Sequence, residues 1–126
     1  MIKVILDTNF LMIPIQFGID IFSEIDDLVL DKYKLLVLDK SIEELKNIFE
    51  TQRGTSKQAA KLALQLLDCK GSILKTDSKD YADDVIVDLA DDETVVCTQD
   101  RELRTRVKEK KAKIIGMKQR NYLDYI

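Results

Sequence analysis

The chain has 126 residues, of which 45% are hydrophobic and 34% charged, with a single proline and no histidine. A chain of this size can bury one hydrophobic core, and this composition excludes an intrinsically disordered protein. It contains no apolar run near the ~18 residues that a membrane-spanning helix needs, and residues 1–6 are too short for the core of a signal peptide. We therefore expect one domain over residues 1–126, located in the cytoplasm and not in a membrane.

The missing histidine excludes several kinds of chemistry. It removes Ser-His-Asp and Cys-His nucleophilic sites and imidazole-bound zinc. The two cysteines, Cys69 and Cys97, are 28 positions apart and do not form a CxxC motif. We expect buried free thiols and neither a disulfide framework nor a thiolate zinc site. Catalysis in this chain must use carboxylates, lysine, hydroxyls or a bound metal ion.

Charge is distributed unevenly along the chain. Residues 101–126 contain nine Lys or Arg and three Asp or Glu, which gives them a net charge of +6. Because the whole chain has a net charge of −3, residues 1–100 have a net charge of −9. Nine acids lie between Thr76 and Asp100 alone. This pattern indicates a cation site beside a surface that binds a polyanion, although two solvated faces of opposite charge would produce the same counts.

Short apolar runs rich in β-branched residues predict five strands, at residues 2–6, 35–38, 73–74, 94–97 and 114–115. Apolar residues at helical spacing predict helices near residues 21–29, 42–49, 60–67, 85–90 and 103–107, and Gly54 is expected to separate the second helix from the third. Alternating strands and helices predict an α/β fold, a three-layer α/β/α sandwich around a parallel sheet. Ligands of such sheets bind beyond the carboxyl ends of the strands.

Acidic residues lie just after the first and the fourth predicted strands. Asp7 comes after the first strand, and Asp100 follows the fourth strand with Thr98 just before it. Both aspartates could instead cap the helix that comes next. A covalent aspartyl-phosphate mechanism is disfavoured, because the position two residues after Asp7 is Asn9 and not a second aspartate.

Two further acidic positions each have an alternative interpretation. Glu44 is expected near the start of the helix after the second strand, where it could form a capping box with Ser41, and Glu43 is the weaker choice for a site residue. Asp83 and Asp84 open the fourth predicted helix, where the helix dipole alone would favour acids. We favour Asp84 for the site, with Asp83 as the alternative.

The common position of these acids indicates a metal site. Asp7, Glu44, Asp84 and Asp100 all fall at carboxyl ends of strands or in the following turn. Carboxylates without histidine or cysteine select Mg²⁺ or Mn²⁺ over zinc. Such ions activate water and stabilise the charge that develops when a phosphodiester is hydrolysed.

The chain resembles PIN-domain ribonucleases over nearly its whole length. The segments that carry the resemblance are Ile5-Leu6-Asp7-Thr8-Asn9, Ile42-Glu43-Glu44-Leu45, Tyr81-Ala82-Asp83-Asp84 and Thr98-Gln99-Asp100-Arg101-Glu102-Leu103. The last two look most like the archaeal single-domain relatives of the small-subunit rRNA-processing endonucleases. The resemblance implies strand order 3-2-1-4-5, a metal held by Asp7, Glu44, Asp84 and Asp100, and supporting roles for Asn9 and Thr98.

The basic carboxyl-terminal segment follows this predicted site. Arg104, Lys108 and Lys111 recur at helical spacing, and together with Arg101 we expect them to contact RNA phosphates, although a solvated helix would look alike. Tyr122 and Tyr125 could stack on bases, pack, or take part in a homodimer.

The sequence therefore predicts a metal-dependent endoribonuclease acting on single-stranded RNA, with precursor ribosomal RNA as the first expectation for the substrate. The alternatives are a toxin ribonuclease of a toxin-antitoxin pair and a non-catalytic module that binds RNA or protein. A protein partner, the oligomeric state and the number of metal ions stay open.

Overall fold

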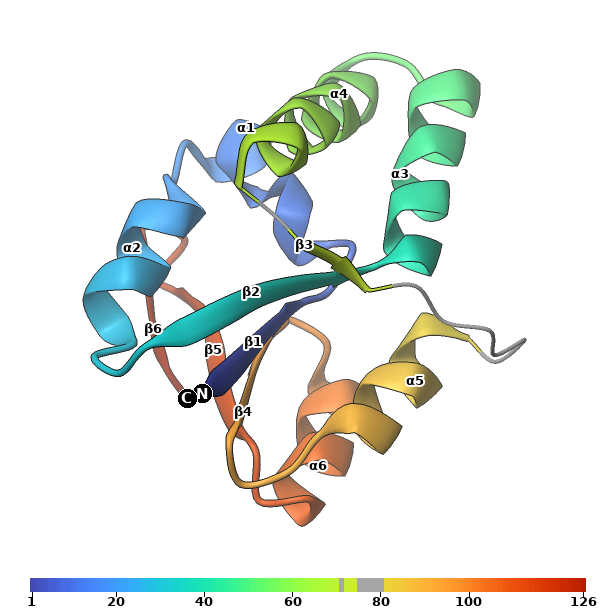
Figure 1. The fold of residues 1–126 in the computed structure, drawn as a ribbon. Helices are drawn as coiled ribbons and strands as arrows, with labels where there is room; N and C mark the ends of the chain where they lie inside the picture. The colour runs from blue at the N-terminus through green and yellow to red at the C-terminus, as the bar shows by residue number, and fades with distance from the viewer. Residues whose placement is uncertain (71, 75–80) are drawn as a thin grey trace.

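The computed structural model describes residues 1–70, 72–74 and 81–126 and contains a six-stranded sheet in the order β3-β2-β1-β4-β5-β6 (Figure 1). The strands are β1 (Ile2–Leu6), β2 (Tyr33–Leu38), β3 (Ser72–Leu74), β4 (Thr94–Cys97), β5 (Lys113–Lys118) and β6 (Tyr122–Tyr125). The first five pair in parallel, which confirms the predicted strand order 3-2-1-4-5. The sixth strand was not predicted.

The sheet is covered on both faces by helices. These are the 3₁₀-helix η1 (Phe10–Met12) and the α-helices α1 (Ile13–Phe17), α2 (Ile21–Leu28), α3 (Asp39–Thr51), α4 (Thr55–Lys70), α5 (Ala82–Leu89) and α6 (Arg101–Glu109). In Figure 1, α1, α2 and α4 lie on one side of the sheet and α5 and α6 on the other, while α3 packs against α4. The predicted three-layer α/β/α architecture is confirmed.

The central strand divides its side chains between the two layers. Val4 and Leu6 of β1 belong to the core cluster under α2 and α4, whereas Ile5 belongs to the cluster under α5 and α6. All three side chains are fully buried, as expected for a strand with a neighbour on each edge and helices on each face. The sheet therefore places the residue after Leu6 at a fixed point between the helical layers.

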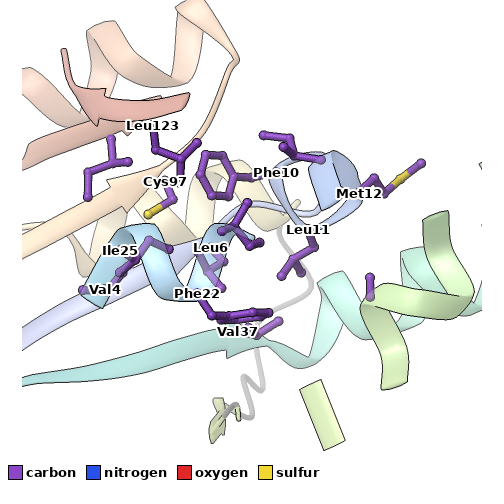
Figure 2. Packing of buried hydrophobic residues seen from close by; sticks show 14 of the residues in the cluster. Val4, Leu6, Phe10, Leu11, Met12, Phe22, Ile25, Val37, Cys97 and Leu123 are labelled. Carbon is purple, nitrogen blue, oxygen red and sulfur yellow. The ribbon is translucent and has the colours of Figure 1, made fainter. Parts of the chain in front are cut away.

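The segment after β1 forms a helical element that the sequence analysis did not predict. Phe10, Leu11 and Met12 of η1 are buried and belong to the same core cluster as Leu6 of β1 (Figure 2). The following α1 ends at Gly18, which adopts a left-handed φ of +68° that suits glycine. The buried side chains of η1 fix the position of the backbone that follows β1.

The carboxyl terminus closes the sheet with β6, which pairs antiparallel to β5. The backbone N–H of Leu123 donates a hydrogen bond of 2.8 Å to Glu24 Oε1 of α2. A side chain thereby satisfies a backbone donor on the edge strand, which makes this edge less available for pairing with another chain.

Cys97 is a buried free cysteine, as predicted, and burial strongly raises the pKa of its thiol. The side chain of Cys69, and the acidic residues Asp77 and Asp80 of the acidic segment, lie outside the described residues. None of the helices described in the structure is long and apolar enough to cross a membrane.

Candidate active site

A cavity of about 290 Å³ opens at the carboxyl edge of the sheet. It is lined by Asp7, Thr8, Asn9, Glu44, Tyr81, Ala82, Asp83 and Asp100. These residues come from the ends of β1 and β4 and from the amino-terminal halves of α3 and α5. The structure thus brings together three of the four predicted acids and the supporting Asn9, and it adds Asp83 in place of Asp84.

Asp7 is the most buried of the acids, with 7% of its surface exposed. Its Oδ1 accepts a hydrogen bond of 2.8 Å from the Thr8 N–H, and its Oδ2 accepts one of 2.9 Å from Thr98 Oγ1. Burial, with smaller contributions from the Asp83 and Glu44 charges, raises the pKa of Asp7 to about 6, against the lowering effect of the two hydrogen bonds. Neither bond caps a helix, since Asn9 is the N-cap of η1. The capping interpretation of Asp7 is therefore wrong.

The Thr98 hydroxyl connects two of the acids. It donates to Asp7 and accepts a hydrogen bond of 3.1 Å from the backbone N–H of Asp100. Thr98 is fully buried, so its rotamer is fixed by both partners. It can therefore hold Asp7 in one orientation and position the turn that carries Asp100.

Asp100 caps α6 and also lines the cavity. Its Oδ1 accepts a hydrogen bond of 3.1 Å from the Leu103 N–H, as the alternative interpretation predicted. The capping bond occupies one carboxylate oxygen, so the residue still has acceptor capacity toward the cavity.

Glu44 does not belong to a capping box. Helix α3 begins at Asp39, directly after β2 and with Leu38 as its N-cap, so Ser41 lies inside the helix instead of before it. The Ser41 hydroxyl is buried without a hydrogen-bond partner among the described residues. Glu44 is consequently in the second turn of α3 and lines the cavity, whereas Glu43 does not.

Asp83 and Asp84 differ in their surroundings. Asp83 lines the cavity, and its pKa is raised, first by burial and then by the neighbouring Asp100 charge. Asp84 Oδ1 instead accepts a bond of 2.7 Å from Arg106 Nη2 of α6, and both of these side chains are partly exposed. The helix places the two carboxylates in different directions, because adjacent residues project about 100° apart.

The basic segment is less uniform than its sequence predicted. Arg104 donates from Nε and Nη2 to the Thr98 carbonyl oxygen, at 3.3 and 3.2 Å, and from Nη2 to Gln99 Oε1 at 3.0 Å. Lys111 lies beyond the end of α6 with a left-handed φ of 65°, so it does not continue the helical spacing. Arg101 and Lys108 are exposed on α6. The four predicted phosphate contacts therefore do not form one helical face.

A larger hollow of about 1010 Å³ lies at the opposite edge of the sheet, around Met1, Leu30 and the start of β2. There Tyr33 donates a hydrogen bond of 3.0 Å to Asp26 Oδ1, and burial together with this bond raises the pKa of Tyr33 to about 12. The charged side chains of this hollow include no buried carboxylate, which leaves the smaller cavity as the candidate site.

The donor chemistry of the cavity fits a hard divalent cation. Its ligand candidates are all oxygens, Asp7 is buried among like charges, and the buried Thr8 hydroxyl has no hydrogen-bond partner among the described residues. Within the described part of the chain, no three acids stand close enough together to enclose an ion. Mg²⁺ does not require such an enclosure, because proteins commonly bind it through one or two carboxylates while it keeps several waters.

Comparison with known proteins places this arrangement in a family. A family model described as "PIN like domain" matches residues 4–120. Ribonuclease VapC4 of Methanocaldococcus jannaschii is 26% identical over 126 residues, which cover 98% of this chain and 96% of the relative. The structure of the PIN domain endonuclease Utp24 matches with a TM-score of 0.79 and 24% identity, over 98% of this chain and 90% of that one, and so shares the fold. The resemblance inferred from the sequence is thus confirmed, and the chain belongs to the PIN-like domain family.

Proposed function

We propose that this protein is a divalent-cation-dependent endoribonuclease that hydrolyses phosphodiester bonds in single-stranded RNA. The observation that carries the proposal is the cavity lined by Asp7, Glu44, Asp83 and Asp100, none of which forms an ion pair with a described residue. Acids gathered in a cavity without a direct ion pair repel one another, and a bound cation would relieve that repulsion. The relationship to a protein named as a ribonuclease supports the choice of substrate.

In this proposal, one or two of the carboxylates of Asp7, Glu44, Asp83 and Asp100 bind Mg²⁺ or Mn²⁺ directly, and the others contact the waters that the ion keeps. When bound, the ion supplies a Lewis acid that activates water and neutralises charge on the phosphate. Asp83 replaces Asp84 in the predicted set, because Asp84 is paired with Arg106 outside the cavity.

The remaining residues orient the site and the strand. Thr98 keeps the Asp7 carboxylate in place through its 2.9 Å hydrogen bond, and Asn9 lies at the cavity wall, where its amide can orient water or a phosphate oxygen. Exposed Arg101, Lys108 and Lys111 contact the RNA backbone. Arg104 serves the structure of the site instead, by holding the Thr98 carbonyl.

We assign the activity first to ribosomal RNA processing, on the likeness of the segments 81–84 and 98–103 to that branch of the family. The alternative is a toxin ribonuclease, which would cleave messenger or transfer RNA and be silenced by a small partner protein. Expression of the parental chain and of Asp7→Asn in a host cell separates the two. Only a toxin would arrest growth when the parental chain is expressed without its partner.

The direct test is incubation of the purified protein with unstructured and structured RNAs in Mn²⁺, Mg²⁺ or chelator. We expect endonucleolytic cleavage of the unstructured RNA with either metal and none with chelator. Asp7→Asn should lower the rate at least about 100-fold. Parental-level cleavage by this variant, or cleavage in chelator, would refute the proposal.

Metal binding has a separate readout in the melting temperature. A ligand at 100 times its dissociation constant stabilises a protein by about 2.7 kcal/mol. Mn²⁺ should therefore raise the melting temperature of the parental protein and leave that of Asp7→Asn nearly unchanged. An equal shift in both proteins would remove Asp7 from the metal site.

A further inference from the structure

Tyr81 is the most exposed aromatic side chain among those the structure describes. It exposes 84% of its surface, compared with 39% for Phe17 and 37% for Tyr122. It also lines the acidic cavity, beside Asp7 and Asp83. A large ring so fully in water at the rim of a candidate site buries almost no apolar surface in the folded protein, so packing does not account for it.

Helix capping does not account for Tyr81 either. The residue is the N-cap of α5, a position where Ser, Thr, Asp and Asn stabilise a helix through a side-chain hydrogen bond. Its side chain forms no such bond, and only its backbone carbonyl serves the helix, by accepting from the Val85 N–H at 3.2 Å. A smaller polar residue would suit the fold at least as well.

The charge of the cavity determines which part of an RNA strand could contact this ring. Phosphates are repelled by the acids unless a cation is present, whereas the bases are neutral and have flat faces. When a phosphate of a single strand enters the cavity, the bases next to it must lie outside the cavity, at its rim. An exposed aromatic ring at the rim offers a surface for one of them, because bases stack on tyrosine whatever their sequence.

We propose that Tyr81 is a nucleobase-stacking platform, which binds a base next to the scissile phosphate and so selects unpaired over paired RNA. The inference rests on the proposed ribonuclease function. It adds that recognition at the site depends on a base being present and not on which base it is. A base held in a duplex cannot reach the ring without leaving its own stack.

The test compares Tyr81→Ser with Tyr81→Phe. Serine removes the ring but is a preferred N-cap, so this variant should fold at least as stably as the parental protein, while phenylalanine keeps the ring. The probe is a single-stranded oligoribonucleotide, cleaved in Mn²⁺. We expect Tyr81→Ser to raise KM about tenfold with kcat within about twofold, because stacking contributes equally to substrate and transition state. Tyr81→Phe and the control Tyr122→Ser should keep the parental values.

A set of oligonucleotides with one abasic position each provides the second measurement. The oligonucleotide whose abasic position is nearest the cleaved bond should have a higher KM with the parental protein and with Tyr81→Phe. Its KM with Tyr81→Ser should not change, because that variant has no ring on which the base could stack. Equal base dependence in Tyr81→Ser and the parental protein, with normal cleavage, would overturn the stacking proposal and leave the ribonuclease function standing.

A binding assay separates the two proposals from each other. In a stopped-flow measurement in Mn²⁺, a fluorescent 2-aminopurine at the same position should be quenched on binding, before cleavage, by the parental protein and not by Tyr81→Ser. Quenching without any cleavage in metal would reject the ribonuclease function and support the platform. A chain that neither cleaves RNA nor quenches the probe would reject both.

Discussion

The carboxyl edge of the sheet and helix α6 carry opposite charges and use them in opposite ways. At the cavity, burial first and the charges of neighbouring acids second raise the pKa values of Asp7 and Asp83. On α6, Arg106 pairs with Asp84, and Arg104 bonds to the Thr98 carbonyl. Bringing the cavity acids together lowers the stability of the fold. The positive charges of Arg104 and Arg106, in contrast, form hydrogen bonds or ion pairs that stabilise it.

This difference separates functional charge from structural charge. Groups that repel one another in a cleft are candidates for function, because folding alone would disperse or pair them. Charges that find partners within the fold need no ligand to explain them. The net balance of a segment, such as +6 over residues 101–126, does not distinguish the two cases.

The largest difference in RNA cleavage is expected between variants of two neighbouring residues, Asp83 in the cavity and Asp84 in an ion pair with Arg106. Asp83→Asn should reduce RNA cleavage about 100-fold or more, because it removes a carboxylate from the cavity. Asp84→Asn should keep activity within about threefold, since it removes only a partly exposed ion pair. Single-turnover cleavage rates in Mn²⁺ measure both. The reverse order would return Asp84 to the site and exclude Asp83.

The stability of the cavity should depend on pH through Asp7. Its folded pKa of about 6 lies above its ordinary value of 3.8, so the folded protein binds the proton more tightly than the unfolded chain. Stability is therefore lost as pH rises through that window, by about 3 kcal/mol in total. Asp7→Asn carries no such charge and should be about 1–3 kcal/mol more stable than the parental protein at pH 8 in chelator.

At pH 3 this advantage should disappear, because that pH lies below both the folded and the unfolded pKa of Asp7, so the residue is largely protonated in both states of the parental chain. Urea unfolding at the two pH values measures the difference. A variant that is less stable than the parental protein at pH 8 would show that the hydrogen bonds from Thr8 and Thr98 outweigh the burial of the charge.

The sheet was predictable because each parallel strand is a short apolar run followed by a helix. Two segments, one that forms η1 with α1 and one that forms β6, were missed for physical reasons. Residues 10–17 are nearly all apolar and contain Pro14, so they have no amphipathic periodicity. Strand β6 is only four residues long, with Asp124 in its middle, and depends on pairing with β5.

The site was predictable in kind and less so in detail. Asp7 and Asp100 were placed correctly just after strands, whereas Glu44 lies one turn further into its helix than predicted, because α3 begins directly at Asp39. Choosing Asp83 requires the phase of α5. Its buried residues Ala82, Val85 and Ile86 define the inward face, from which Asp83 is about 110° away and Asp84 about 150°. That signal was present in the sequence. The inward direction of Arg104 was not, because it depends on a carbonyl at the end of β4.

Arg104 should affect stability and leave RNA binding unchanged. Arg104→Ala removes the donors to the Thr98 carbonyl and to Gln99, whose Oε1 also accepts a bond of 2.6 Å from the Met117 N–H. Loss of charged hydrogen bonds of this kind costs about 2 kcal/mol. The matched control, Arg101→Ala on the exposed side of the same helix turn, should stay within about 0.5 kcal/mol in urea unfolding. Equal losses from both would contradict a structural role specific to Arg104.

The smallest effect should come from the exposed basic residues that remain. Replacement of Arg101, Lys108 and Lys111 by serine should flatten the log-log salt dependence of single-strand binding by about two units, since each phosphate that a side chain neutralises contributes about 0.7 to the slope. Binding of all sequences should weaken alike, because phosphate contacts position a strand without distinguishing its bases. The stability of the fold should hardly change, since these side chains are exposed.

The matched control replaces three exposed lysines of other elements, Lys32, Lys34 and Lys61, by serine and changes the net charge equally. Its salt dependence should stay that of the parental protein. If both triple variants flatten the slope to the same extent, RNA responds to the overall charge of the protein and not to the basic residues of the carboxyl-terminal segment. The positive charge of the carboxyl-terminal segment would then have no specific role at the site, and the orientation of the RNA would depend on contacts within the cavity itself.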